Sequence, residues 1–215
     1  MSASESSAPQ PDHDCPLCPR LVDFRLKQRA TFPDWHNAPV PSFGDIDGRL
    51  LIVGLAPGLR GANRTGRPFT GDYAGNLLYA TLLKFGFARG DYKERPDDGL
   101  TLVDCRIANA VRCVPPENKP EPSEIKTCHQ FLVAEIAAMK KLRAVMALGK
   151  IAHDAAVRAL AGSLGTHLFA HGRLHQIGTI ALTDSYHCSR YNTNTGRLTT
   201  EMFESAVAGI RRGLD

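Results

Sequence analysis

Apolar runs alternate with helical patterns along the chain. Residues 49–55 ("RLLIVGL") and 143–149 ("RAVMALG") are continuous apolar stretches, typical of strands buried on both faces of a parallel sheet. Residues 100–113 predict another central strand, and residues 172–187 predict a strand pair that turns at Gly178. Helices are predicted in the segments between them, at 15–30, 74–87, 122–142, 150–162 and 198–214. This alternation predicts an α/β fold whose sheet is covered on both faces.

Three polar or glycine-rich segments follow predicted strands. They are "GLAPG" from Gly54, "NAVRC" from Asn109 and "SYHCSRYNTNTG" from Ser185. Ligands of open α/β sheets bind outside the carboxyl ends of the strands. We therefore expect these three segments to converge on one crevice.

The length of 215 residues fits one α/β domain, which we expect over residues 15–215. Residues 1–14 ("MSASESSAPQPDHD") are polar and have no apolar leader core, so they predict a disordered tail. The sequence contains no apolar run of the roughly 18 residues that a membrane span needs. A cytoplasmic, monomeric protein is the resulting expectation.

The net charge of +4 permits an anionic partner such as nucleic acid without requiring one. Arginines gather near the glycine-rich segments, which favours such a partner more than the total does. Ordinary surface charge is the alternative explanation of the same arginines.

Four of the six cysteines have a spacing that can hold a metal. Cys15 and Cys18 form a C-x2-C pair, and Cys113 and Cys128 follow far downstream with fourteen residues between them. Such a split set can close a four-cysteine site for zinc or for a [4Fe–4S] cluster, and the spacing does not choose between the two. The alternative is a simple turn with Cys113 in the core.

The segment 54–75 ("GLAPGLRGANRTGRPFTGDYAG") holds six glycines and a single carboxylate, Asp72. It lacks the Lys-Ser/Thr pair of a phosphate loop and the glycine spacing of a dinucleotide fingerprint. Asp72 is a candidate catalytic acid or a helix N-cap. His187 and Asn109 are candidate polar groups at strand ends, and Phe69 is either a stacking platform or a core anchor.

These motifs resemble the uracil-DNA glycosylase superfamily. The segments "GLAPG", "RTGRPFTGDYAG", "NAVRC" and "SYHCSRYNTNTGRLT", with the cysteine layout, are most similar to its iron–sulfur family 5, the type-b enzymes. The resemblance extends from Cys15 to the last helix. It implies a three-layer sandwich with a central, mainly parallel four-stranded sheet, and a structural [4Fe–4S] cluster on Cys15, Cys18, Cys113 and Cys128. It also implies that the protein hydrolyses the N-glycosidic bond of uracil in DNA, leaving an abasic site.

The resemblance assigns roles to the candidate residues. The related family 4 carries an acid in "GEAPG" where this sequence has Leu55, so Asp72 is expected to supply the acid, as in type-b enzymes that also accept hypoxanthine or xanthine. The expected catalytic residues are Asp72, His187 and Asn109. The expected base-binding residues are Gly54, Ala56, Gly58, Phe69, Asn109 and His187. The expected DNA-binding residues are Arg64, Ser189, Arg190 and Asn192.

Two other functions remain open from the sequence. One is a non-catalytic module that binds damaged DNA through the same pocket, and the other is a hydrolase of free nucleotides. Formation of abasic sites on uracil-containing DNA separates the enzyme from the module, and a preference for free dUMP would favour the nucleotide hydrolase.

Overall fold

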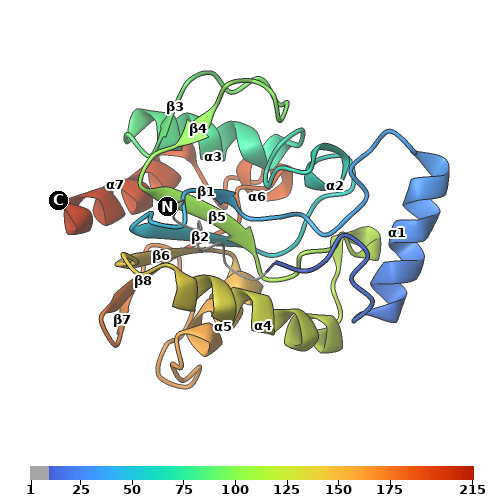
Figure 1. The fold of residues 1–215 in the computed structure, drawn as a ribbon. Coiled ribbons are helices and arrows are strands. Elements are labelled where there is room, and N and C mark those ends of the chain that lie inside the picture. The colour runs from blue at the N-terminus through green and yellow to red at the C-terminus, as the bar shows by residue number, and fades with distance from the viewer. Residues whose placement is uncertain (1–9) are drawn as a thin grey trace, which may run out of the picture.

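The computed structural model describes residues 10–215, and a six-stranded mixed sheet forms the centre of this part of the chain (Figure 1). The strand order is β1-β5-β2-β6-β8-β7. In that order, the strands span Phe43–Gly44, Cys105–Asn109, Leu50–Gly54, Ala144–Leu148, Ile180–Ser185 and Leu174–Ile177. The four inner strands are parallel, and β1 and β7 pair antiparallel at the two edges. The predicted four-stranded parallel sheet is therefore the inner part of a wider mixed sheet.

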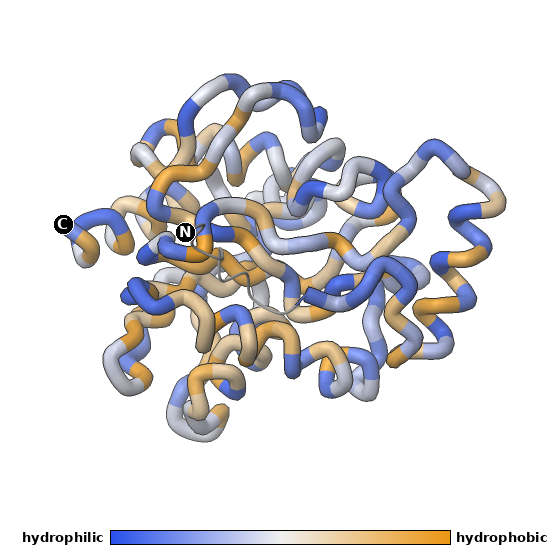
Figure 2. The backbone as a smooth tube through the Cα atoms, viewed as in Figure 1, coloured by the Kyte–Doolittle hydropathy of each residue, from blue (hydrophilic) through white to orange (hydrophobic). Residues whose placement is uncertain are grey.

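Helices cover both faces of the sheet and complete three layers, as predicted (Figure 1). Strand β2 illustrates this burial on both faces, because its successive side chains point to opposite faces of the sheet. Leu50 and Ile52 pack in the cluster formed with α3 and α7, whereas Leu51 and Val53 pack in the cluster formed with α4 and α5. The apolar colouring of the central strands follows this burial (Figure 2). The four covering helices span Tyr73–Lys84 (α3), Pro122–Ala138 (α4), Lys150–Ala159 (α5) and Thr200–Leu214 (α7).

The remaining elements lie outside these layers. Helix α1 lies at one end of the molecule (Figure 1). These elements are α1 (Pro19–Thr31), α2 (Ala62–Thr65), α6 (Arg190–Asn194), the 3-10 helix η1 (Pro116–Asn118), β3 (Ala88–Arg89) and β4 (Thr101–Leu102). None of the described helices combines the length and apolar character needed to cross a membrane.

The strand predicted over residues 100–113 is divided in two. Thr101–Leu102 (β4) pairs with β3 in a separate two-stranded ribbon, and Cys105–Asn109 (β5) enters the main sheet. The chain turns between them at Asp104, which has a φ of 53° and whose carboxylate accepts bonds from the backbone N–H and guanidinium of Arg49. The apolar pattern did not reveal the turn because apolar residues flank it on both sides.

The predicted tail falls mostly on residues 1–9, which lie outside the described residues. Its last five residues, 10–14, are described and contact the body of the protein. Gln10 donates a 2.8 Å hydrogen bond to Glu135, and Asp14 accepts a 2.5 Å hydrogen bond from Arg29. The limits of the single domain expected over 15–215 stay a prediction.

A fully buried carboxylate, Glu135 of α4, joins segments that are distant in sequence. It accepts hydrogen bonds from Arg112 at 2.8 Å and Ser42 at 2.7 Å, and it also pairs with Arg106. Burial alone would raise the pKa of Glu135, but Arg112, Ser42 and Arg106 lower it below the ordinary value of a glutamate. A carboxyl group with a lowered pKa stabilises the fold at neutral pH, and this stabilisation is lost as the pH falls through that pKa.

We predict that Glu135→Ala lowers the free energy of unfolding by about 3–5 kcal/mol, because it leaves the buried guanidinium of Arg112 and the partly buried guanidinium of Arg106 without their carboxylate partner. Urea unfolding at neutral pH measures the loss. Lys141→Ala, which removes an exposed ion pair with Asp47, is the control and should change stability by less than about 0.5 kcal/mol. An equal effect of the two substitutions would show that the buried network does not stabilise the fold.

Candidate active site

The three predicted segments converge at the carboxyl ends of the parallel strands. Gly54 ends β2 and pairs with Asn109 at the end of β5, and His187 follows β8 by two residues. A cavity of about 640 Å³ opens there, within the usual size range of small-ligand sites. It is lined by Leu55, Ala56, Pro57, Gly58, Leu59, Arg60, Gly61, Ala62, Phe69, Asp72, Tyr73, Ala74, Asn109, Asn118, His187, Ser189 and Arg190.

A second hollow, of about 800 Å³, lies at the other end of the sheet. It is bordered by the first residues of β6 and by α7, with Ala144, Ala181 and Ile210 in its wall. The predicted catalytic residues lie outside this hollow. Its larger volume therefore does not make it the candidate active site.

Asp72 brings the single carboxylate of the glycine-rich segment into the cavity. It occupies the N-cap position of α3, but its side chain makes no capping bond. Its Oδ1 is buried and has no hydrogen-bond partner among the described residues. Its Oδ2 packs against the backbone at Gly58 and Gly61, where any side chain at Gly61 would collide with the carboxylate. Burial raises the pKa of Asp72 above the ordinary aspartate value.

Asn109 and Phe69 meet over Gly54. A side chain at Gly54 would collide with Asn109 Oδ1 and with the ring of Phe69, so the glycine lets both groups approach the end of β2. Asn109 Oδ1 is buried without a partner among the described residues. The Phe69 ring lies 5.9 Å from that of His187. An unpaired amide oxygen and an aromatic face thus stand beside each other in one wall of the cavity.

His187 adds a neutral ring to the same cavity. Burial lowers its pKa to about 4, so the imidazole carries no charge at neutral pH. Its loop is held by Asn192, which donates a 2.8 Å hydrogen bond to the carbonyl of His187, and a side chain at Gly149 would be in van der Waals contact with the His187 Cβ. A neutral imidazole can donate a hydrogen bond from one ring nitrogen and accept one at the other.

The four predicted DNA-binding residues separate into two groups. Ser189 and Arg190 line the mouth of the cavity, and the Arg190 guanidinium lies 5.2 Å from the centre of the Tyr73 ring. Arg64 is exposed but stands outside the cavity lining, beside Gly71. The amide of Asn192 is engaged with the carbonyl of His187, so it supports the loop.

Sequence reasoning missed Asn118 and Tyr73 as lining residues. Asn118 lies at the end of η1 with a φ of 57°, a left-handed conformation that asparagine tolerates better than most residues. The segment "PPENKP" signals a turn but not which cavity it faces. Tyr73 stands next to Asp72 at the start of α3, and its proximity to the acid was the available signal.

The four predicted metal-ligating cysteines surround a small cavity beside α1. Cys15, Cys18, Cys113 and Cys128 all line it, among apolar side chains. Arg25 donates to Cys113 Sγ at 3.6 Å, and the backbone N–H of Arg112 donates to Cys128 Sγ at 3.3 Å. Burial raises the pKa of the Cys18 thiol to about 11 and that of Cys113 to about 12, so a metal bound here would displace their protons.

Among the described residues, the buried side chains of His153, His175 and Asp184 also bring three candidate ligand atoms within 4.8 Å of one another. His153 Nδ1 lies 2.6 Å from one oxygen of Asp184, and His175 Nε2 lies 3.0 Å from the other. His153 Nε2 faces the carbonyl of His167 at 2.8 Å. These are hydrogen-bond lengths, so the three side chains satisfy one another as a hydrogen-bond network that ties α5 to β8. Asp184, which accepts from both histidines, stands three residues before His187.

Comparison with known proteins agrees with this geometry. The family model described as "Uracil DNA glycosylase superfamily" matches residues 41–211. A type-5 uracil-DNA glycosylase of Thermus thermophilus is 42% identical over 205 residues, which cover 92% of this chain and 93% of that protein. A type-5 uracil-DNA glycosylase of Pyrobaculum aerophilum is 39% identical over 192 residues, 87% of this chain and 84% of that protein.

The type-4 relatives match a smaller part of the chain. A type-4 uracil-DNA glycosylase of Thermotoga maritima is 36% identical over 135 residues, which cover 61% of this chain and 62% of that protein. The difference agrees with Leu55, which stands where the sequence pattern of family 4 has an acid. By the family model and the type-5 relatives, the chain belongs to the uracil-DNA glycosylase superfamily, in its type-5 group.

Proposed function

We propose that this protein is a DNA-repair glycosylase that hydrolyses the N-glycosidic bond of uracil in DNA and leaves an abasic site. The observation that carries the proposal is the partly unpaired carboxylate of Asp72 in a cavity that also presents Phe69, Asn109 and neutral His187. An aromatic face, an amide and a neutral imidazole suit a flat, uncharged base. Its type-5 relatives carry the name of this activity.

A base stacked inside duplex DNA cannot reach a cavity at the end of a sheet. The nucleotide must rotate out of the helix, at an expense of a few kcal/mol. We assign to Ser189 and Arg190, which line the cavity, the binding of the flanking phosphates, which would offset part of that unfavourable free energy. Phe69 then stacks on the extruded base, and the amide of Asn109 bonds its polar edge.

Bond cleavage separates charge, and the site has a group for each sign. As the C1′–N bond breaks, its electron pair leaves with the base and the sugar becomes cationic. Asp72 stabilises the cation and orients the water whose oxygen bonds to C1′, and the proton released by that water passes to the carboxylate or to the base. His187 donates a hydrogen bond to the departing base anion, which a neutral imidazole can do.

Other deaminated bases belong to this proposal as further substrates. The cavity is wide enough for a small ligand, and Leu55 supplies no charged group to restrict the base edge. We include hypoxanthine and xanthine on that ground. A monomer in the cytoplasm stays the expectation from the sequence.

Two alternatives use the same cavity. A module that binds damaged DNA without cleavage would bind uracil-containing duplexes and produce no abasic sites. A nucleotide hydrolase would prefer free dUMP to DNA. The buried carboxylate favours the glycosylase over the module, because binding a neutral base gives no reason to desolvate a charge.

We also propose that Cys15, Cys18, Cys113 and Cys128 hold a [4Fe–4S] cluster. The convergence of the four cysteines on one small cavity and the N–H groups donated to two of their sulfurs support a bound cluster. The cluster would link the segment before α1 to α4 and to the chain after β5, as a structural crosslink. In this proposal, base excision itself uses the residues of the 640 Å³ cavity, not the cluster.

The first test is Asp72→Asn. We expect single-turnover excision of uracil from duplex DNA to fall by about a hundredfold or more, because the amide carries no charge to stabilise the sugar cation. The raised pKa of Asp72 means that its ionised form destabilises the folded protein at neutral pH, so the same substitution should raise the melting temperature. Excision near the wild-type rate would remove Asp72 from the mechanism.

The second test concerns the cluster. Protein purified without oxygen should be brown and contain four iron atoms per chain, and Cys128→Ser should lose both iron and thermal stability. Cys105→Ala is the matched control, since Cys105 is buried in β5 away from the cluster residues and its replacement should retain iron. A colourless wild-type protein that contains zinc would refute the assignment.

The third test addresses DNA binding at the cavity mouth. Arg190→Ala should weaken binding to duplexes of any sequence and reduce the slope of log K against log salt by about one, as expected for one lost phosphate contact. Lys140→Ala is the control. Lys140 lies just after α4, near the amino ends of the strands, and its replacement should leave the slope unchanged. An unchanged slope for Arg190→Ala would assign the phosphate contact elsewhere.

A further inference from the structure

Phe69 adopts a backbone conformation that its side chain does not favour. Its φ is 53°, in the left-handed region that aromatic residues rarely enter. Such strain persists only where the surroundings fix the backbone, and it concentrates at functional sites. Phe69 is 7% exposed and its ring lies 5.9 Å from that of His187, so this backbone conformation decides where the stacking face lies.

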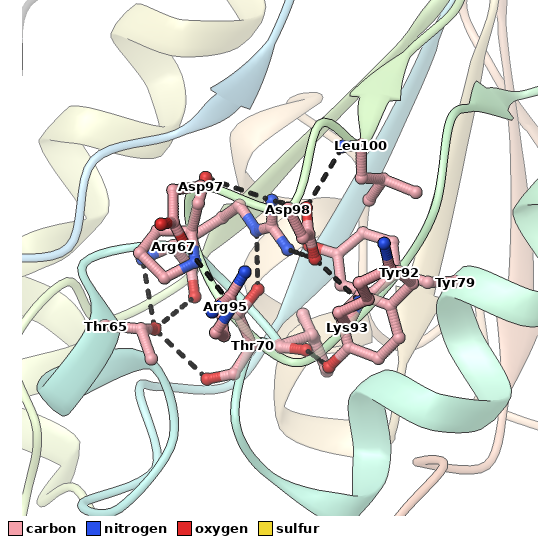
Figure 3. A network of polar contacts seen from close by, with 12 residues as sticks. Thr65, Arg67, Thr70, Tyr79, Tyr92, Lys93, Arg95, Asp97, Asp98 and Leu100 are labelled. Atoms are coloured by element: carbon pink, nitrogen blue, oxygen red, sulfur yellow. Dashed lines mark hydrogen bonds and ion pairs between the residues drawn. The ribbon is translucent and has the colours of Figure 1, made fainter.

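Two tyrosine hydroxyls fix the peptide groups on either side of this strain. Tyr79 donates to the carbonyl of Pro68 at 2.6 Å, and Tyr92 donates to the carbonyl of Phe69 at 3.0 Å. The two tyrosine rings pack against each other with centroids 4.6 Å apart (Figure 3). The carbonyls before and after Phe69 Cα are therefore both held.

A buried ion pair, Arg67–Asp98, holds the residues just before Phe69. Arg67 donates two hydrogen bonds to Asp98, at 2.8 and 2.7 Å, and a third to the Thr70 hydroxyl at 2.7 Å (Figure 3). Asp98 also accepts the backbone N–H of Lys93 at 2.9 Å. Arg67 holds the pKa of Asp98 far below its usual range. Asp98 thus ties the chain just before Phe69 to the chain just after Tyr92.

The Tyr92 hydroxyl also lies close to the first turn of α3, next to Asp72. A side chain at Gly75 would collide with both the carbonyl of Phe69 and the hydroxyl of Tyr92. The N–H of Gly75 donates to the carbonyl of Asp72 at 3.2 Å. Tyr92 therefore sits where the Phe69 peptide meets the first turn of α3, the turn that carries Asp72.

We infer that Tyr92 and Asp98 are positioning residues for base recognition: they hold the strained Phe69 backbone and fix the stacking ring relative to Asp72. Neither side chain lines the cavity, so both act through Phe69. The inference rests on the proposed glycosylase function. It assigns to the loop 91–98 a part in recognising the extruded base.

Tyr92→Phe is the mildest test, because it removes one hydroxyl and keeps the ring that packs on Tyr79. The probes are a duplex with one 2′-fluoro-2′-deoxyuridine, whose glycosidic bond resists cleavage, and the same duplex with thymidine at that position. We expect Tyr92→Phe to weaken binding of the uracil analogue about three- to tenfold, the effect of one hydrogen bond, and to leave binding of the thymidine duplex unchanged.

Asp98→Asn and Asp97→Asn form a matched pair in the same loop. Asp98 is buried against Arg67, whereas Asp97 is exposed beside Arg95 at 3.6 Å. Asp98→Asn should lower uracil discrimination in the same way as Tyr92→Phe, and single-turnover excision should fall with it. Asp97→Asn should match the wild type in stability, binding and rate.

The outcomes separate the inference from the function it rests on. If the wild type excises uracil and folded Tyr92→Phe keeps the wild-type ratio of the two dissociation constants, the positioning role is wrong, even if its melting temperature drops. If Asp98→Asn does not fold, Tyr92→Phe still decides. If the wild type itself makes no abasic sites, the proposed function fails, while the two dissociation constants still show whether Tyr92 positions a base-binding surface.

Discussion

The buried carboxylate of Glu135 is the interaction on which much of this structure depends. It lies at 0% exposure in α4 and draws together Arg106 of β5, Arg112 after β5, and Ser42 before β1. A buried charge is tolerated only when paired, so these segments are obliged to meet at one point. Arg112 is also the neighbour of Cys113, and its N–H donates to Cys128. The same charge network therefore aligns the sheet and the two downstream cysteines.

The candidate active site follows a second physical rule, in which unfavourable local terms are offset by the surrounding structure. Asp72 is a desolvated carboxylate with a raised pKa, and Phe69 has a left-handed backbone. Both features destabilise the folded state by themselves. For Phe69, the compensation comes from the hydrogen bonds of Tyr79 and Tyr92 and from the Arg67–Asp98 pair, which join its segment to α3 and to residues 91–98. Glycines at 54, 61 and 75 then allow the approach of side chains that would otherwise collide with a Cβ.

Much of the fold could be predicted because its signals are local. The runs at 49–55 and 143–149 are β2 and β6, and their full burial follows from helices on both sides. The helices α3, α5 and α7 lie where their periodicity placed them. The strand predicted at 100–113 was too long because the turn at Asp104 is stabilised by Arg49, fifty-five residues away in sequence. The edge strand β1 has two residues, too few to leave a pattern.

The sequence by itself determined the kinds of chemistry available: one acid in a glycine-rich segment, polar residues at three strand ends, and four cysteines spaced for a metal. These are properties of residue type and spacing, which short windows contain. Only the tertiary structure decided which of them face one cavity. In the tertiary structure, Ser189, Arg190 and Asn118 line the candidate active-site cavity. Asn192 instead hydrogen-bonds to the backbone of His187. Such outcomes depend on contacts between residues far apart in the chain, and no local pattern records which distant group will arrive beside a given side chain.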